Sequence, residues 1–290
     1  MPKKIERKLV VPRGLDPKSV RSLNATALRA QGKTFKANSR RFRELQNLKV
    51  GAAKLAAKES GVRRAPVSKA MIADTKRIVG SLHRLLPDTP PPTPLIYGPP
   101  YSSSIPLQSS LTGETLFIPW DNAPNARTGQ VGGSLTAFSL RGGVATVQSA
   151  VSSIFNAPVS GVYDVDIGAT MRGIYYVVSP PFGIAEVEAD LYVNFTDNAR
   201  VPSSYQAKTN LVGGLVGVFA GGRELTPITN PNGLSQFDQR YSFTVGDAPG
   251  NVQIDAGVIL KVTATPGAVA MIDLEMTILS IGFAFASAIP

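Results

Sequence analysis

A repeated alternation of apolar and polar residues over residues 107–290 constrains the fold more than any other feature. In residues 185–195 the apolar side chains alternate with Glu186, Glu188 and Asp190, which predicts a half-buried strand whose acids face water. The same period of two recurs, strongly or weakly, in residues 115–119, 134–140, 145–155, 163–167, 208–220, 241–245, 252–262 and 272–278. No long amphipathic helix interrupts these segments. The pattern predicts a mainly β fold, an antiparallel jelly-roll sandwich of about eight strands.

The N-terminal segment differs, because its apolar residues recur at helical spacing. Asp16 followed by Pro17 predicts an N-cap and the first position of a helix that ends at Gly32. A second helix is predicted over residues 34–59 and a third from about Pro66. The apolar stripe predicted for the second helix comprises Phe35, Phe42, Leu45, Leu48, Ala52 and Leu55.

A proline-rich stretch separates the two kinds of pattern. Eight prolines lie between Pro87 and Pro106, and such a run favours extended polyproline conformation. A ligand for an SH3 or WW domain is the alternative interpretation of these prolines. The sequence therefore predicts a basic amphipathic helical arm at residues 1–86, a Pro-rich linker at 87–106 and a separate jelly-roll domain at 107–290.

Charge is divided along the same boundary. The chain has 30 Lys and Arg against 20 Asp and Glu, and residues 1–88 hold 22 of the bases and 6 of the acids, a balance of +16. The remaining 8 bases and 14 acids give residues 89–290 a balance of −6. A basic arm on an acidic body is typical of polyanion binding.

The basic clusters are spread along the arm, which favours nucleic-acid binding without sequence specificity over a single reading helix. A basic surface that faces protein or solvent is the alternative. The candidate phosphate contacts are Lys3, Lys4, Arg7, Lys8, Arg21, Arg40, Arg41, Arg43, Arg63, Arg64, Lys76 and Arg77.

Several other classes of site are disfavoured. The chain has no cysteine and one histidine, His83, so neither a thiolate centre nor a histidine metal cluster is expected. The acids alternate along strands and are expected to solvate a face. The alternative is that oxygen ligands bind Ca²⁺ at a subunit contact, namely Asp164, Asp166, Asp197 and Asn198. No signal peptide, membrane span, cofactor or catalytic group is predicted.

The order of basic arm, proline-rich hinge and β sandwich resembles the coat proteins of small icosahedral viruses. In that family a jelly roll tiles the shell and the arm faces the genome. The resemblance implies a non-enzymatic homo-oligomer that binds packaged nucleic acid and resides in the virion after synthesis in the host cytoplasm.

Residues 155–290 also resemble C1q/TNF-like jelly rolls. The similar segments are Pro158 to Tyr163, Leu191 to Asn194, Val252 to Leu260 with a central glycine, and Ser280 to Phe285. This resemblance implies a trimer packed through apolar faces, in which Ile281, Phe283 and Phe285 contribute to subunit contacts. The alternative function is therefore a trimeric receptor-binding tip or spike of a virus or phage particle, anchored by the basic helices.

Overall fold

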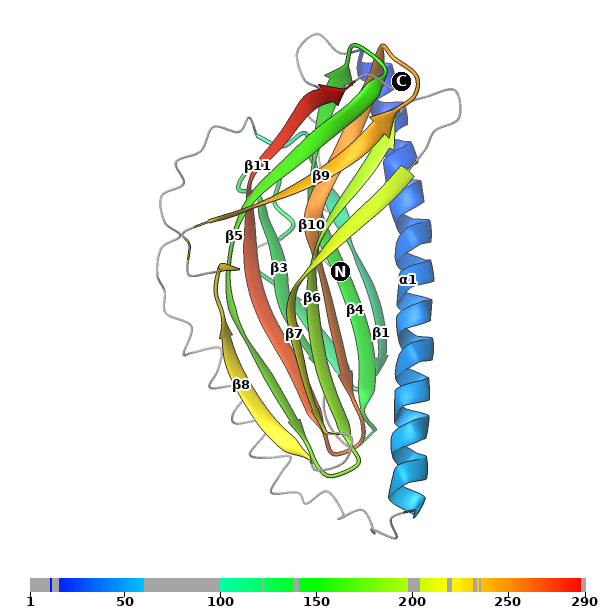
Figure 1. The fold of residues 1–290 in the computed structure, drawn as a ribbon, viewed down its shortest axis with the longest axis vertical. Coiled ribbons are helices and arrows are strands. Elements are labelled where there is room, and N and C mark those ends of the chain that lie inside the picture. Colours follow the sequence, from blue (N-terminus) through cyan, green and yellow to red (C-terminus); the bar gives the residue numbers. More distant parts are fainter. Residues whose placement is uncertain are drawn as a thin grey trace, which may run out of the picture.

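A computed structural model describes residue 11 and residues 16–59, 100–120, 123–137, 141–197, 204–217, 221–231, 234 and 236–287. It comprises one long helix, α1 (Pro17–Glu59), and two antiparallel sheets that form a β sandwich. Figure 1 shows α1 running along one side of the sandwich. The predicted fold class is confirmed.

The first sheet has five strands in the order β1-β4-β10-β6-β7. Their bounds are β1 (Ser103–Gly113), β4 (Gly143–Ala157), β6 (Ile184–Asp197), β7 (Ser204–Gly217) and β10 (Gly250–Ala264). The central strand β10 pairs with β4 and β6 over nearly its whole length. A Cβ on Gly257 would lie 2.0 Å from the carbonyl oxygen of Ser149. The close approach of β4 therefore requires the central glycine of this strand.

The second sheet has the order β2-β3-β11-β5-β8, and β9 also pairs with β5. Its strands are β2 (Thr115–Pro119), β3 (Gln130–Ala137), β5 (Gly161–Ser179), β8 (Gly222–Ile228), β9 (Phe237–Val245) and β11 (Val269–Ser287). Every second side chain along each strand points into the space between the two sheets. They form one continuous apolar core that includes Val165, Leu191, Ile254, Leu260 and Ile272.

Two strands lie where the sequence predicted none. β1 begins at Ser103, inside the range predicted as linker, and contains Pro106. Proline is tolerated there because β1 is an edge strand with an irregular register between Ile105 and Gln108. β8 was missed because Pro227 and the preceding glycines resemble a turn.

The helical arm also differs from its prediction. The two helices predicted around Gly32 form one helix, because an internal glycine costs only about 1 kcal/mol and packed side chains on both sides outweigh it. Instead of belonging to a body separate from the sandwich, α1 packs directly on β10, β6, β1 and β4. The predicted third helix lies outside the described residues.

Candidate nucleic-acid interface

Helix α1 begins at the predicted cap. The carboxylate of Asp16 accepts hydrogen bonds from the backbone N–H of Ser19 at 2.9 Å and of Lys18 at 3.3 Å. The bond from the Ser19 backbone, with that from its hydroxyl, lowers the pKa of Asp16. The cap satisfies N–H groups that have no partner inside the helix.

The buried side of α1 differs from the predicted stripe. Its buried positions are Val20, Leu23, Ala27, Gln31, Phe35, Ser39, Phe42, Gln46 and Ala53. Of the six residues of the predicted stripe, Phe35 and Phe42 are buried, whereas the other four are exposed, namely Leu45, Leu48, Ala52 and Leu55. That prediction was wrong because it selected the face by hydrophobicity, whereas Gln31 and Gln46 turn toward the sheet and hydrogen-bond to its carboxylates.

The acids of β6 were predicted to face water. Glu186 and Asp190 instead lie buried beneath α1. Glu186 is 7 % exposed and Asp190 is 6 % exposed. Gln46 Nε2 donates to Glu186 Oε2 at 2.9 Å, and Lys49 Nζ contacts both oxygens of Glu186 at 2.8 and 2.9 Å. The sequence analysis missed this cover because period-two alternation defines two faces of a strand without showing which of them a helix occupies.

Lys261 of β10 forms ion pairs with the next two acids of β6, Glu188 and Asp190. Lys261 Nζ on β10 lies 2.5 Å from Glu188 Oε2, 2.8 Å from Asp190 Oδ2 and 5.6 Å from the ring centroid of Phe42 on α1. Burial opposes the charged ammonium, but attraction and hydrogen bonds from Asp190 and Glu188 together outweigh it and raise the pKa of Lys261. The helix therefore covers a cluster in which one ammonium of the sheet is shared by two carboxylates.

A second buried carboxylate lies nearer the N-terminal half of α1. Asp255 is fully buried and accepts hydrogen bonds from Gln31 of the helix and from Ser152, Asn194 and Gln253 of the sheet. Burial raises the pKa of Asp255, and the four donors offset part of that effect. Hydrogen bonds from Gln31, Gln46 and Lys49 to carboxylates of the sheet, together with apolar contacts, therefore hold α1 on the sheet.

The basic residues of α1 lie outside its buried positions, although Lys49 reaches Glu186 of the sheet. The helix has eleven bases and two acids, Glu44 and Glu59, a net charge of +9. Arg40 pairs with Glu44 and Lys49 pairs with Glu186. The remaining bases form no ion pair among the described residues. All eleven are exposed, namely Lys18, Arg21, Arg29, Lys33, Lys36, Arg40, Arg41, Arg43, Lys49, Lys54 and Lys58.

Four of the predicted phosphate contacts therefore lie together on one helix. Arg21, Arg40, Arg41 and Arg43 are exposed on α1. The other predicted contacts lie outside the described residues; they are Lys3, Lys4, Arg7, Lys8, Arg63, Arg64, Lys76 and Arg77. The helix also exposes seven cations that the sequence analysis did not predict as phosphate contacts, since none of them adjoins another base in the sequence. These are Lys18, Arg29, Lys33, Lys36, Lys49, Lys54 and Lys58.

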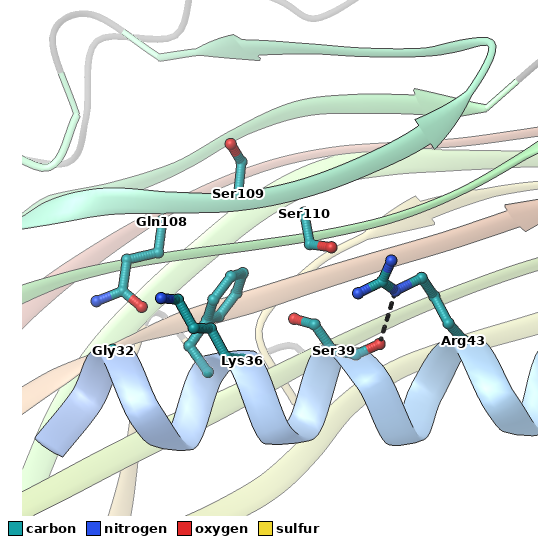
Figure 2. A pocket seen from close by; sticks show the side chains of 8 residues that line it. Gly32, Lys36, Ser39, Arg43, Gln108, Ser109 and Ser110 are labelled. Atoms are coloured by element: carbon teal, nitrogen blue, oxygen red, sulfur yellow. Dashed lines mark hydrogen bonds between the residues drawn. The ribbon is translucent and has the colours of Figure 1, made fainter.

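A groove lies between α1 and the edge strand β1, with a volume of about 320 Å³. Figure 2 shows the side of α1 that carries Lys36, Ser39 and Arg43 facing Gln108 and Ser110 of β1. Arg43 Nε donates to the backbone carbonyl of Ser39 at 3.4 Å. The groove brings two cations, hydroxyls and an amide into one concave surface.

Ser39 is 2 % exposed, and its Oγ has no hydrogen-bond partner among the described residues. Gln108 Oε1 is likewise buried without a partner there. The sequence analysis missed Lys36 and Ser39, although the spacing of residues 36, 39 and 43 places them on one helix face and could have indicated them.

The described residues contain no group of three His, Cys, Asp or Glu that could hold a metal ion. Asp164 and Asp166, considered as calcium ligands, bond to Ser242 and Arg240 across the β5–β9 pair. Within the same described part of the chain, no helix is long and apolar enough to cross a membrane.

Comparison with known proteins assigns no family to the chain. No family model and no curated protein matches it. Among solved structures it is similar to a carbohydrate-binding module, TmCBM61 in complex with β-1,4-galactotriose, at 11 % identity and TM-score 0.18, covering 60 % of this chain and 88 % of that one. It is also similar to tailspike protein 4 of bacteriophage CBA120, at 11 % identity and TM-score 0.23, covering 59 % and 19 %. An infectious bursal disease virus structure matches at 13 % identity and TM-score 0.13, covering 67 % and 44 %.

Proposed function

We propose that this chain is a non-enzymatic structural protein of a virus particle, a coat protein that self-associates through its β sandwich while its basic N-terminal segment binds packaged nucleic acid. One observation carries the proposal: α1 lies on an acidic sheet face, yet, over the residues that the structure describes, only Lys49 of its eleven bases pairs with an acid of that sheet. The helix is therefore held by other contacts, and its cations are left to meet an external polyanion.

The arrangement suits binding to phosphates more than base recognition. The cations are distributed along the whole helix of 43 residues, and its only aromatic side chains, Phe35 and Phe42, are buried against the sheet. Aromatic stacking on bases therefore has no support on α1. If about ten phosphates are neutralised along the arm, the logarithm of affinity falls with the logarithm of salt concentration at a slope near −9.

The experiment is size-exclusion chromatography with light scattering on the full chain, with the ratio of absorbance at 260 and 280 nm recorded at low and at high salt. We expect particles of very high mass with a nucleic-acid spectrum. Deleting residues 1–59 is expected to leave a folded β sandwich without nucleic acid. Particles that load equally well without those residues contradict the proposal.

A receptor-binding trimer is the second candidate, and exposed aromatic side chains at one end of the sandwich favour it. Phe283 stacks on Tyr163 with ring centroids 4.4 Å apart, and Phe285 lies 5.4 Å from the same ring while remaining 48 % exposed. Tyr205 on β7 is also exposed at this end, within 5.6 Å of Phe243. A stable, nucleic-acid-free species of three chains in the same chromatogram supports this candidate over the coat.

A further inference from the structure

The groove between α1 and β1 differs in charge from the rest of the helix–sheet interface. Its charged lining side chains are Lys36 and Arg43, and none of its lining residues is acidic. These two residues are seven positions apart, which separates their Cα atoms by about 10 Å along the helix. Ser39 lies between them on the same face. A tetrahedral anion placed over Ser39 would therefore have a cation on either side.

The buried polar atoms in this groove also indicate a ligand. A buried hydroxyl without a hydrogen bond is unfavourable, and Ser39 Oγ has no partner among the described residues. The amide of Gln108, across the groove, also has a buried atom without a partner, and rotation of that amide would present an N–H₂ donor there. An anion in the groove satisfies the hydroxyl and the amide together.

The strand that closes the groove can add backbone donors. Among the described strands, β1 pairs with β4 alone and forms the edge of its sheet, so alternate main-chain groups along Gln108–Ser110 point away from the ladder. Figure 2 shows Ser110 turned toward the helix, while Ser109 points away from it. The Ser110 hydroxyl thus faces the same space as Lys36 and Arg43, and Ser109 lines the groove although its side chain points away from the helix.

We infer that this groove binds a phosphodiester group of nucleic acid through Lys36, Ser39 and Arg43, an inference that rests on the proposed function. The opposite flank of α1 provides the contrast. A depression there of about 290 Å³ is lined by Arg41, Lys208 and Lys261, but also by Glu188, whose carboxylate repels phosphate. The groove at β1 is therefore a defined phosphate contact within an otherwise diffuse basic surface.

The test measures binding of a short fluorescein-labelled single-stranded oligouridylate to the full chain by fluorescence anisotropy. Ser39→Ala removes the hydroxyl without changing net charge, so a purely diffuse electrostatic surface would not register it. We expect this variant to bind at least about tenfold more weakly, as for one lost hydrogen bond to a charged group. Its thermal unfolding should match that of the native chain, because the hydroxyl has no hydrogen-bond partner within the described part of the chain.

A pair of double variants provides the matched control. Lys36→Gln with Arg43→Gln removes two charges from the groove, and Lys33→Gln with Lys54→Gln removes two exposed charges of the same helix outside it. We expect the groove variant to reduce the salt slope by about 1.4, because each phosphate contact on a single strand contributes about 0.7, and the control to reduce it by less than about 0.7.

The two proposals fail in different ways. If the native chain binds the oligouridylate but Ser39→Ala binds equally well and both double variants lose the same affinity, the groove inference is overturned and nucleic-acid binding stands. If the native chain does not bind the oligouridylate at low salt, the proposed function and the phosphate assignment are both overturned.

Discussion

The two faces of the first sheet differ in chemistry: the inner face is apolar, whereas the face beneath α1 contains buried polar and charged groups. On β10, Ile254 and Leu260 point into the apolar core between the sheets. Their neighbours Asp255 and Lys261 point toward α1 and are held by hydrogen bonds and ion pairs. The stability of the apolar face depends on how much volume and area its side chains fill and bury. The stability of the polar face depends on every buried polar group having its hydrogen-bond or ion-pair partner.

The two faces of the first sheet are stabilised by different kinds of contact. The inner face is buried between two sheets and does not need the helix for cover. The outer face has apolar contacts as well, since Leu28 of α1 packs against a buried cluster of the sheet that includes Ile105 and Ile259. Its charged groups nevertheless require matched partners, so the register of α1 on the sheet is fixed by a few specific bonds. A helix held in a fixed register presents its outward cations in a fixed pattern.

Truncating the inner face should have the largest effect on stability. Leu260→Ala removes a side chain that is 1 % exposed in the core. We expect a loss of about 2–5 kcal/mol, because the lost burial and the cavity left behind both contribute. Urea denaturation measures it. The control Leu48→Ala, at a leucine of α1 that is 71 % exposed, should change stability by less than about 0.5 kcal/mol. Equal losses at the two positions would contradict the assignment of the core.

Removing the cation of the outer face should have a smaller effect. Lys261→Met leaves Glu188 and Asp190 without their ammonium beneath the helix. We expect a loss of about 2 kcal/mol, below the 3–5 kcal/mol typical of a fully buried pair, because the Glu188 side chain is 30 % exposed. Adding Asp190→Asn should recover part of the loss in a double-mutant cycle. Additive losses would show that the two side chains do not interact.

The apolar half of this comparison could be predicted from sequence. Alternation located β2, β4, β6, β9, β10 and the central part of β11, because a strand with one face in a core needs an apolar residue at every second position. The cap at Asp16 was predicted as well, since its chemistry is local. Both signals are contained in a few neighbouring residues.

The polar half could not be predicted, because its partners are distant in sequence. Gln31 and Asp255 are separated by 224 residues, and Gln46 and Glu186 by 140. Glutamine in a helix and glutamate in a strand each indicate a solvated face when considered alone. The groove was missed for the same reason, since Ser39 becomes informative only once β1 lies opposite it.

The pH dependence of Asp255 sharpens the contrast further. Burial raises the pKa of Asp255 in the folded chain above its ordinary value of 3.8. Its contribution to stability is therefore fully present below pH 3.8 and is lost as the pH rises through the folded-state value. We expect the native chain to gain stability relative to Asp255→Asn as the pH is lowered through this window. Urea denaturation of both chains over a pH series measures the difference, and a constant difference would contradict the raised pKa.

The smallest effect is expected at the start of α1, where Asp16 is exposed and acts locally. Its lowered pKa has the opposite sign to that of Asp255, so the cap stabilises the helix above pH 3.8 and is lost as the pH falls through the folded-state value. Asp16→Ala should speed amide hydrogen exchange at Ser19 and Val20 with little change in the core strands. Asp16→Asn keeps a capping oxygen that does not titrate, so it should preserve slow exchange at acid pH where the native chain loses it. If exchange in both variants matches that of the native chain at every pH, packing of Val20 and Leu23 on the sheet, and not the cap, holds this end of the helix.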